Sequence, residues 1–332
     1  MKKRSITRMA ICYDFDGTLS PRYMQEYGFF LGLPEKERKT FFKQSNELAR
    51  TKEADPILTY MQLMIKKAAN SDAKLGTTRK DFKAYGKDIE FFPGVPTWFK
   101  RITEYAASKQ VKLDHYIISS GLKEIVEGSK IGKCFKKIYA CSFLHGVNDA
   151  AEWPAQVVNF TTKTQYLFRI NKGSEDVSDV KQVNEYINPE DRPVPFSHMI
   201  YMGDGETDVP CMRLVKEQGG HSVAVYSPGK KKSHATALKL FKDGRVNYVV
   251  QADYSEGKLL DEIVKGIVDV VATKAQLHCL SRRAVPKISD AKKEIADPNM
   301  SDDSTAANGE ALPPETLPTA DVKAESNLKG EP

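Results

Sequence analysis

The chain has 332 residues and a formal net charge of +6, with 40% hydrophobic and 28% charged residues. This composition is typical of globular proteins and excludes a fibrous or wholly disordered chain, and the length allows one large domain or two ordinary ones. No apolar run approaches the roughly 18 residues of a membrane span, and the basic start precedes too short an apolar stretch for a signal peptide. We therefore expect a cytoplasmic protein with no membrane partner.

The charge is unevenly distributed along the chain. Residues 289–332 hold ten acidic and four basic residues, so this end carries −6 and the rest +12. The same end has no aromatic residue and no hydrophobic period, which predicts a disordered acidic tail over 286–332. The positive charge of the rest of the chain suits anionic small substrates, and its lysines are too dispersed to favour nucleic acid. The lysine run at 230–232 is interpreted as a loop. Five cysteines without metal-ligand spacing predict buried free thiols in a reducing cytoplasm.

Short apolar runs rich in β-branched and aromatic residues predict six strands, at 9–13, 115–118, 137–143, 198–202, 222–226 and 246–250. These runs lack polar alternation and are separated by helical periodicity, as in a parallel sheet covered on both faces. Helices are predicted at 96–107, 123–130, 209–218 and from 255 to about 280. We therefore expect an α/β protein with a doubly wound, Rossmann-like parallel sheet.

Residues 21–94 interrupt this alternation directly after the first strand. Helices are predicted over 35–52, over 56–68 and over 79–89, and Asp55 with Pro56 gives the second a capped start. We expect a helical cap domain at 21–94, inserted into a catalytic core made of 1–20 and 95–285. Proline and glycine mark both ends of the insertion, so hinges are expected near Ser20 and Pro21 and near Pro93 and Gly94.

Carboxylates follow two of the predicted strands. Asp14 and Asp16 lie in Asp-Phe-Asp-Gly-Thr after the first, and Asp204 and Asp208 lie in Gly-Asp-Gly-Glu-Thr-Asp after the fourth. Parallel sheets bind ligands at the carboxyl ends of their strands, and oxygen-rich clusters suit Mg²⁺ better than a soft metal. A tight turn or an acidic surface loop would explain either segment taken alone.

A hydroxyl pair and a glycine follow the second predicted strand, at Ser119, Ser120 and Gly121. If they open the next helix, its free N–H groups and a hydroxyl form a natural phosphate cradle. The alternative is a plain helix cap.

Together these motifs resemble the haloacid dehalogenase-like superfamily of aspartyl-phosphate hydrolases, over about residues 9–250. The resemblance implies that Asp14 is the nucleophile that takes the phosphoryl group, and that Asp16 is the general acid and then the base. It implies that the substrate is bound by Thr18, Ser119, Ser120 and Gly121. It implies that Mg²⁺ is held by Asp14, Asp16 through its backbone carbonyl, Asp204 and Asp208.

The resemblance also implies a lysine upstream of the last motif. Lys163, ahead of an amphipathic stretch, fits this role best, and Lys172, at the end of that stretch, is the weaker alternative. Dehalogenase members lack a carboxylate at the position of Asp16 and ATPase members carry threonine there, so this aspartate favours a phosphatase.

The helical insertion resembles the cap of phosphoserine phosphatase-like and phosphoglycolate phosphatase-like members. The former place a substrate-binding glutamate nine residues after the nucleophile, where this chain has Tyr23, and the nearest acid is Glu26. This departure puts phosphoserine in doubt. No cap arginine stands out among Arg38, Arg50 and Arg79.

We therefore expect a Mg²⁺-dependent phosphomonoester hydrolase that acts through an aspartyl-phosphate intermediate on a small phosphorylated metabolite. One alternative is a non-catalytic binding or regulatory module, which would not need the full polar set. Others are a phosphotransferase and a nucleic-acid end phosphatase, although a cap closing over the site would exclude duplex ends. The oligomeric state stays open.

Overall fold

The structure is a computed structural model that describes residues 6–70 and 75–284. Residues 1–280 form one compact unit, and residues 281–332 are assigned to a second. The acidic tail expected at 286–332 lies outside the described residues, as do residues 1–5 of the expected core. None of the described helices is long and apolar enough to span a bilayer.

A seven-stranded sheet forms the centre of the first unit, in the order β4-β3-β2-β1-β5-β6-β7. Every neighbouring pair is parallel except β3 with β4. The strands are β1 (Thr7–Tyr13), β2 (Val111–Leu122), β3 (Lys137–His145), β4 (Ala151–Gln156), β5 (Met199–Gly203), β6 (His221–Tyr226) and β7 (Tyr248–Gln251). The strand order reverses at β1, which confirms the predicted doubly wound α/β class. All six predicted strands are present with shifted ends, and the structure has a further strand, β4, that was not predicted.

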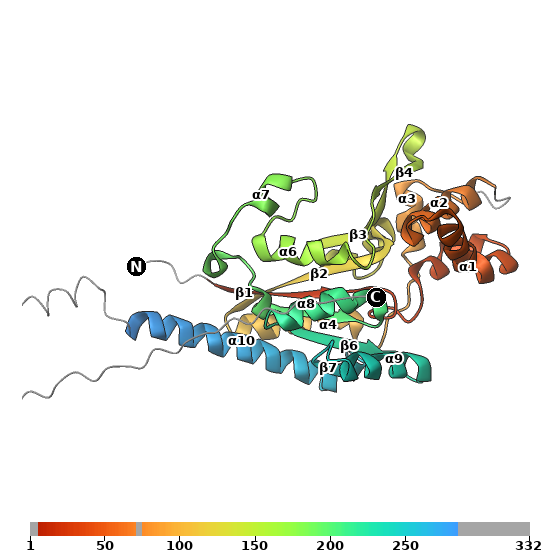
Figure 1. The fold of residues 1–332 in the computed structure, drawn as a ribbon. Helices are drawn as coiled ribbons and strands as arrows, with labels where there is room; N and C mark the ends of the chain where they lie inside the picture. The colour runs from red at the N-terminus through yellow and green to blue at the C-terminus, as the bar shows by residue number, and fades with distance from the viewer. Residues whose placement is uncertain (1–5, 71–74, 285–332) are drawn as a thin grey trace, which may run out of the picture. The chain divides into compact units, whose positions relative to one another are not determined.

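Helices cover both faces of the sheet, and Figure 1 shows α6 on one side with α4 and α10 on the other. They are α4 (Val95–Ser108), α5 (Lys123–Gly128), α6 (Lys163–Lys172), α7 (Val180–Asn184), α8 (Val209–Glu217), α9 (Lys231–Lys242) and α10 (Leu259–Ala284). Arg101 of α4 pairs with Asp261 of α10 at 3.0 Å. The prediction of a loop at 230–232 is wrong, because Lys231 and Lys232 lie in the first turn of α9. The segment is helical because Ala237 and Leu240 give it a buried face.

The insertion after β1 contains α1 (Glu35–Lys52), α2 (Pro56–Ala69) and α3 (Arg79–Tyr85), preceded by the 3₁₀ turns η1 (Met24–Tyr27) and η2 (Phe29–Gly32). Helix α2 begins where the capping pattern predicts, because Asp55 accepts hydrogen bonds from the N–H groups of Ile57 and Leu58. Helix α3 is shorter than the predicted 79–89 and ends before Gly86. The boundaries of the insertion at 21 and 94 stay a prediction.

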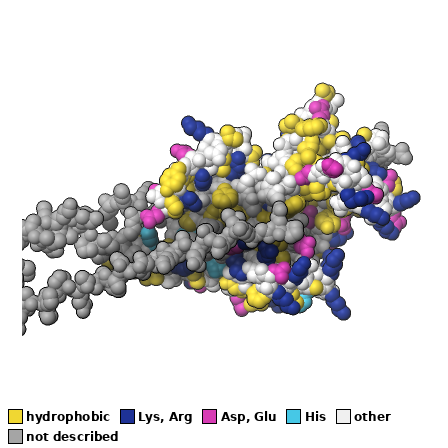
Figure 2. Space-filling model, in the orientation of Figure 1, with side chains coloured by type: hydrophobic (Ala, Val, Ile, Leu, Met, Phe, Trp, Pro, Cys, Tyr) yellow, Lys and Arg dark blue, Asp and Glu magenta, His cyan; other side chains and the backbone are white. Residues whose placement is uncertain are grey.

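Strands β3 and β4 form a hairpin arm at the edge of the sheet, beside α2 and α3 (Figure 1). Thr78 and Ala150 form an isolated bridge between the arm and the insertion. Leu144 and Trp153 are paired across the hairpin and are 56% and 70% exposed. Figure 2 shows hydrophobic side chains on this projecting arm. The sequence did not predict the arm, because β4 contains Pro154 and only two buried or half-buried apolar positions.

The cysteines are all free, in agreement with the prediction of thiols without disulfides. Cys12, Cys141 and Cys211 are buried as expected, but Cys134 is exposed and Cys279 is partly exposed. Cys134 ends the 3₁₀ turn Gly132–Cys134, which has no buried residue.

A buried hydrogen-bonded cluster joins β1, β2 and α4. The Nε1–H of Trp98 donates to the Tyr13 hydroxyl at 2.8 Å, and this hydroxyl lies 3.0 Å from Nδ1 of His115. The other ring nitrogen of His115 lies 3.0 Å from the Thr103 hydroxyl. Burial lowers the pKa of His115 to about 4. The imidazole is therefore neutral in the folded protein at neutral pH.

We expect the free energy of unfolding to fall as the pH is lowered from about 6.5 to about 4. The unfolded chain protonates His115 near pH 6.5 whereas the folded chain resists until about pH 4, so protons favour the unfolded state within this window. The contribution is about 3 kcal/mol. Urea unfolding across this range should show a larger loss for the wild type than for His115→Asn. Equal losses would assign the pH dependence to other groups.

Candidate active site

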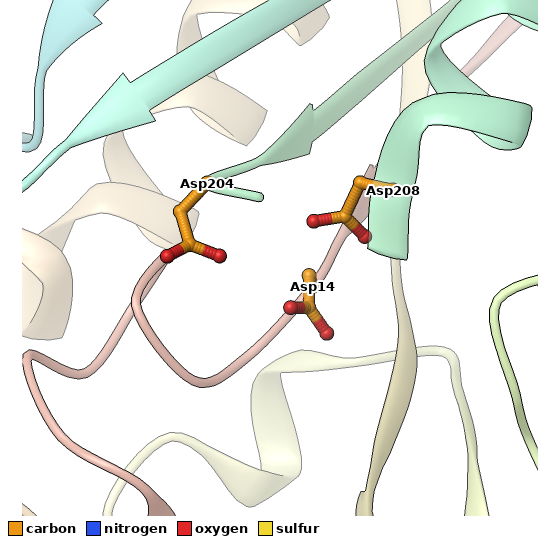
Figure 3. Close-up of side chains that lie close together, drawn as sticks. All are labelled: Asp14, Asp204 and Asp208. Atoms are coloured by element: carbon orange, nitrogen blue, oxygen red, sulfur yellow. The ribbon is translucent and has the colours of Figure 1, made fainter. Parts of the chain in front are cut away.

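Three aspartates bring their carboxylates together at the carboxyl ends of β1 and β5. Asp14 follows β1, Asp204 follows β5, and Asp208 directly precedes α8. One oxygen of each lies within 4.8 Å of the others, and Figure 3 shows the three carboxylates facing a common space. The N–H of Asp14 donates to the carbonyl of Met202 at 2.9 Å. Two motifs far apart in the sequence thus form one cluster, because β1 and β5 are neighbours in the sheet.

Lys163, the first residue of α6, brings a positive charge to this cluster. Its ammonium lies 3.0 Å from Oδ1 of Asp14 and donates to Oδ1 of Asp208 at 2.7 Å. Burial lowers the pKa of Lys163, but the two carboxylates raise it by more, so the side chain stays charged. Lys172, at the other end of α6, donates instead to the carbonyls of Val183 and Glu185.

The cluster carries more negative charge than its lysine balances. The pKa of Asp14 is raised to about 6 and that of Asp204 to about 8, mainly by burial and also by the charge of Asp208, although the charge of Lys163 lowers both. Oδ2 of Asp208 is buried and has no hydrogen-bond partner among the described residues. An unsatisfied anionic oxygen is costly inside a protein unless a cation approaches it. The donor set, all oxygen, therefore fits a hard divalent cation such as Mg²⁺.

Tyr201 belongs to the site, although the sequence analysis did not select it. Its hydroxyl donates to Oδ1 of Asp208 at 2.7 Å, and the residue is fully buried in β5. This bond and the Lys163 bond both reach Oδ1, which orients the Asp208 carboxylate. No sequence signal marks this role, because a tyrosine within an apolar strand reads as a core residue.

Asp16 is joined to the first turn of the insertion. Its Oδ1 accepts a hydrogen bond from the backbone N–H of Met24 at 2.9 Å. Burial, and next the charge of Asp14, raise the pKa of Asp16 well above its usual range, which favours a carboxyl that holds a proton. Thr18 is fully buried, and its hydroxyl has no partner within the described ranges; its carbonyl accepts a bond from the Tyr254 hydroxyl at 2.8 Å.

Ser119, Ser120 and Gly121 do not open a helix, which corrects the expectation. Strand β2 continues to Leu122, and the register with β3 shifts between Ile118 and Leu122, so the three residues form an irregular strand end. The physical reason is the hydrogen bonding there: Ser119 Oγ accepts from the Gly121 N–H at 3.1 Å, and the Leu122 N–H donates to the sulfur of Met24. In the described part of the chain, no hydrogen bond or ion pair joins these three residues to the carboxylate cluster.

Gly17 lets the loop after β1 approach Asp204. Its φ is +76°, and a Cβ atom there would overlap the Asp204 carboxylate. We expect Gly17→Ala to lower the free energy of unfolding by about 1–3 kcal/mol for the backbone conformation alone, with a further steric cost. Gly205→Ala is the matched control, because φ is −141° there and a Cβ would meet nothing within 4 Å. Urea unfolding measures both, and equal effects would contradict this account.

Two carboxylates of the cluster and its lysine are nearly closed to solvent, whereas Asp204 is half-buried. Asp14 is 7% exposed, Lys163 1% and Asp208 fully buried. A cavity of about 480 Å³ lies elsewhere, along α3, and its lining contains none of the cluster residues: Arg79, Lys80, Lys83, Ala84, Lys87, Gly128 and Asp149.

No family model matches the chain. It is 30% identical over 205 residues to a curated protein of Borreliella burgdorferi described as an uncharacterized protein, and the match covers 55% of this chain and 68% of that protein. A solved HAD-family hydrolase from Salmonella enterica serovar Typhi is 16% identical, with 78% of this chain and 75% of that chain covered and a TM-score of 0.49.

A phospho-aspartyl intermediate analogue of phosphoserine phosphatase is 14% identical, with coverages of 78% and 99% and a TM-score of 0.48. Cytosolic 5′-nucleotidase IIIB bound to cytidine is 15% identical, with coverages of 82% and 88% and a TM-score of 0.44. On identity and coverage, the chain belongs to one family with the B. burgdorferi protein, and the order of its motifs along a doubly wound sheet resembles that of the haloacid dehalogenase-like superfamily.

Proposed function

We propose that this protein is a Mg²⁺-dependent phosphomonoester hydrolase that acts on a small phosphorylated substrate through an aspartyl-phosphate intermediate. The observation that carries the proposal is the buried ammonium of Lys163, bonded between Asp14 and Asp208 within a cluster of three carboxylates. Burying this much charge costs stability, so a module that only binds a partner has no use for it. Phosphoryl transfer, by contrast, depends on placing a nucleophile among cations.

In the first step, an oxygen of Asp14 attacks phosphorus and the bond from phosphorus to the leaving oxygen breaks. Asp16 gives its proton to that leaving oxygen, and its raised pKa suits a proton donor. In the second step, Asp16 takes a proton from water while the water oxygen attacks phosphorus. The bond from phosphorus to the Asp14 oxygen breaks, which regenerates the Asp14 carboxylate and releases inorganic phosphate.

The other residues of the site hold the nucleophile, the metal ion and the phosphate in place. Asp14, Asp204, Asp208 and the backbone carbonyl of Asp16 would hold Mg²⁺, which when bound supplies the positive charge that offsets repulsion between carboxylates and phosphate. Lys163 keeps the Asp14 carboxylate oriented and charged. Ser119, 1% exposed at the end of β2, is the proposed phosphate contact, and Thr18, Ser120 and Gly121 are further proposed contacts with the substrate.

We propose that residues 21–94 act as a cap over a core of 1–20 and 95–285. The near-complete burial of Asp14 supports this, because a cap that moves would expose the nucleophile to substrate. The proposed hinges are tied to the core: the Tyr254 N–H donates to the Pro93 carbonyl at 2.8 Å, and Lys230 donates to the Pro21 carbonyl at 3.1 Å. A cytoplasmic location remains part of the proposal, supported by the free cysteines.

Metal removal tests the proposal. We expect hydrolysis of 4-nitrophenyl phosphate to stop when divalent cations are removed with EDTA and to return when Mg²⁺ is added in excess. The physical reason is that the carboxylate cluster repels the phosphate of the substrate and that Lys163 is the one cation bonded to it among the described residues. Full activity in excess chelator would contradict the proposal, as would the absence of hydrolysis of any ester in a panel of phosphorylated metabolites with Mg²⁺.

A further inference from the structure

A partly exposed aromatic residue, Tyr23, is the chain neighbour of the residue that binds Asp16, and the proposed reaction does not use it. Tyr23 directly precedes Met24, whose N–H donates to Asp16 at 2.9 Å. Tyr23 is 53% exposed, although Met24 is fully buried. After burial, the charges of Asp16 and Asp204 are the largest causes that raise the pKa of its phenol. The backbone of Tyr23 therefore adjoins the group that binds Asp16.

The ring of Tyr23 is backed by other aromatic residues of the insertion. Its centroid lies 4.8 Å from that of Phe42, and Phe42 lies 6.4 Å from Tyr60. The Tyr60 hydroxyl donates to the carbonyl of Ser120 at 2.7 Å. The row Tyr23–Phe42–Tyr60 is thus anchored near Asp16 at one end and at the end of β2 at the other, which holds Tyr23 in place.

The chemistry of Asp16 decides what Tyr23 would contact. Asp16 protonates the leaving oxygen, so the group attached to that oxygen must extend to the Asp16 side of the site. Met24, the residue after Tyr23, binds Asp16 on that side of the site. The side chain of Tyr23 offers an aromatic face and a polar hydroxyl. An isolated exposed tyrosine needs no explanation, but this one packs against Phe42 and directly precedes the residue that binds Asp16.

We propose that Tyr23, backed by Phe42, forms the leaving-group subsite and selects phosphate monoesters whose leaving group carries a planar aromatic ring. Aryl-alcohol phosphates and nucleoside 5′-phosphates share this chemistry. Ring pairs contribute about 0.5–1.5 kcal/mol beyond their buried area, so a preference of about 3- to 10-fold is expected. This inference rests on the proposed phosphatase function.

A matched pair of esters tests the inference by kinetics. Benzyl phosphate and cyclohexylmethyl phosphate both release a primary alcohol of similar basicity, so they differ in aromaticity rather than in leaving-group reactivity. We expect kcat/KM to favour the benzyl ester about 3- to 10-fold in the wild type and in Tyr23→Phe, and not in Tyr23→Ala. Tyr186→Ala is the control, because Tyr186 is 83% exposed and belongs to none of the described site segments.

A second pair distinguishes the two sources of the ring. A preference for uridine 5′-monophosphate over ribose 5-phosphate that also disappears in Tyr23→Ala would indicate nucleoside 5′-phosphates. A preference confined to the benzyl ester would indicate aryl-alcohol phosphates. No ring preference in either pair would overturn the inference while leaving the phosphatase function intact.

Binding of non-hydrolysable probes separates failure of the subsite from failure of the function. We expect benzylphosphonate to bind the wild-type protein with Mg²⁺ about 3- to 10-fold more tightly than cyclohexylmethylphosphonate in calorimetry, and Tyr23→Ala to bind both equally. Equal affinities in the wild type, or a preference retained by Tyr23→Ala, would overturn the inference. Ring-selective binding without hydrolysis of any ester would reject the phosphatase function and support the subsite.

Discussion

Asp14→Asn is expected to lower the turnover of any hydrolysed phosphate ester by on the order of 10⁴-fold or more, because an amide cannot act as the nucleophile. The loss should be chemical rather than structural. The backbone N–H of Asp14 that bonds to Met202 is unaffected, and the amide oxygen still faces the ammonium of Lys163. Steady-state kinetics with circular dichroism as the folding control measures this effect.

Asp16→Asn separates the two leading aspartates. This variant keeps the nucleophile and removes the group that donates and accepts the proton, so the rate should fall by about 10²–10⁴-fold. Asparagine at position 16 can still accept the hydrogen bond from the Met24 N–H. A phospho-enzyme should accumulate in Asp16→Asn and be absent from Asp14→Asn, as rapid quench and intact-protein mass spectrometry would show. Near wild-type turnover by Asp14→Asn would show that the assigned roles are wrong.

Lys163→Met is expected to lower the free energy of unfolding by about 3–5 kcal/mol and to abolish activity. The substitution keeps the length of the side chain but leaves Asp14 and Asp208 buried without the ammonium that pairs them. Removing one partner of a buried ion pair carries a cost of this size, because the remaining charge is uncompensated. Urea unfolding in metal-free buffer at neutral pH gives the stability directly.

Two further variants define the cause of this loss. Lys172→Met, at the opposite end of α6, removes an ammonium that bonds to two backbone carbonyls, and it should cost far less in stability and spare the activity. Adding Asp208→Asn to Lys163→Met removes one uncompensated charge, so part of the stability should return without activity. A larger loss of activity in Lys172→Met than in Lys163→Met would contradict the assignment of Lys163.

The sequence by itself determined the features that depend on nearby residues. The start of α2 follows from Asp55 and Pro56, because an N-cap is a bond between groups two or three positions apart. The buried strands follow from continuous apolar runs, because both faces of a parallel sheet are covered. The carboxylate cluster of Asp14, Asp204 and Asp208 was predictable, because side chains that follow parallel strands lie at one edge of the sheet.

Tertiary structure decided everything that depends on which segments become neighbours. Lys163 meets Asp208 across 45 positions, whereas Lys172 lies nine residues further along the same helix and faces other groups. The hydrogen bond from Tyr201 to Asp208 likewise depends on the folded chain. So does the irregular end of β2, where the sulfur of Met24 from the insertion accepts a hydrogen bond from the Leu122 N–H. These contacts arise from strand order and from the direction in which a helix face points. No local propensity encodes either, so only the folded chain selects the lysine, orients the Asp208 carboxylate and joins Met24 to Asp16.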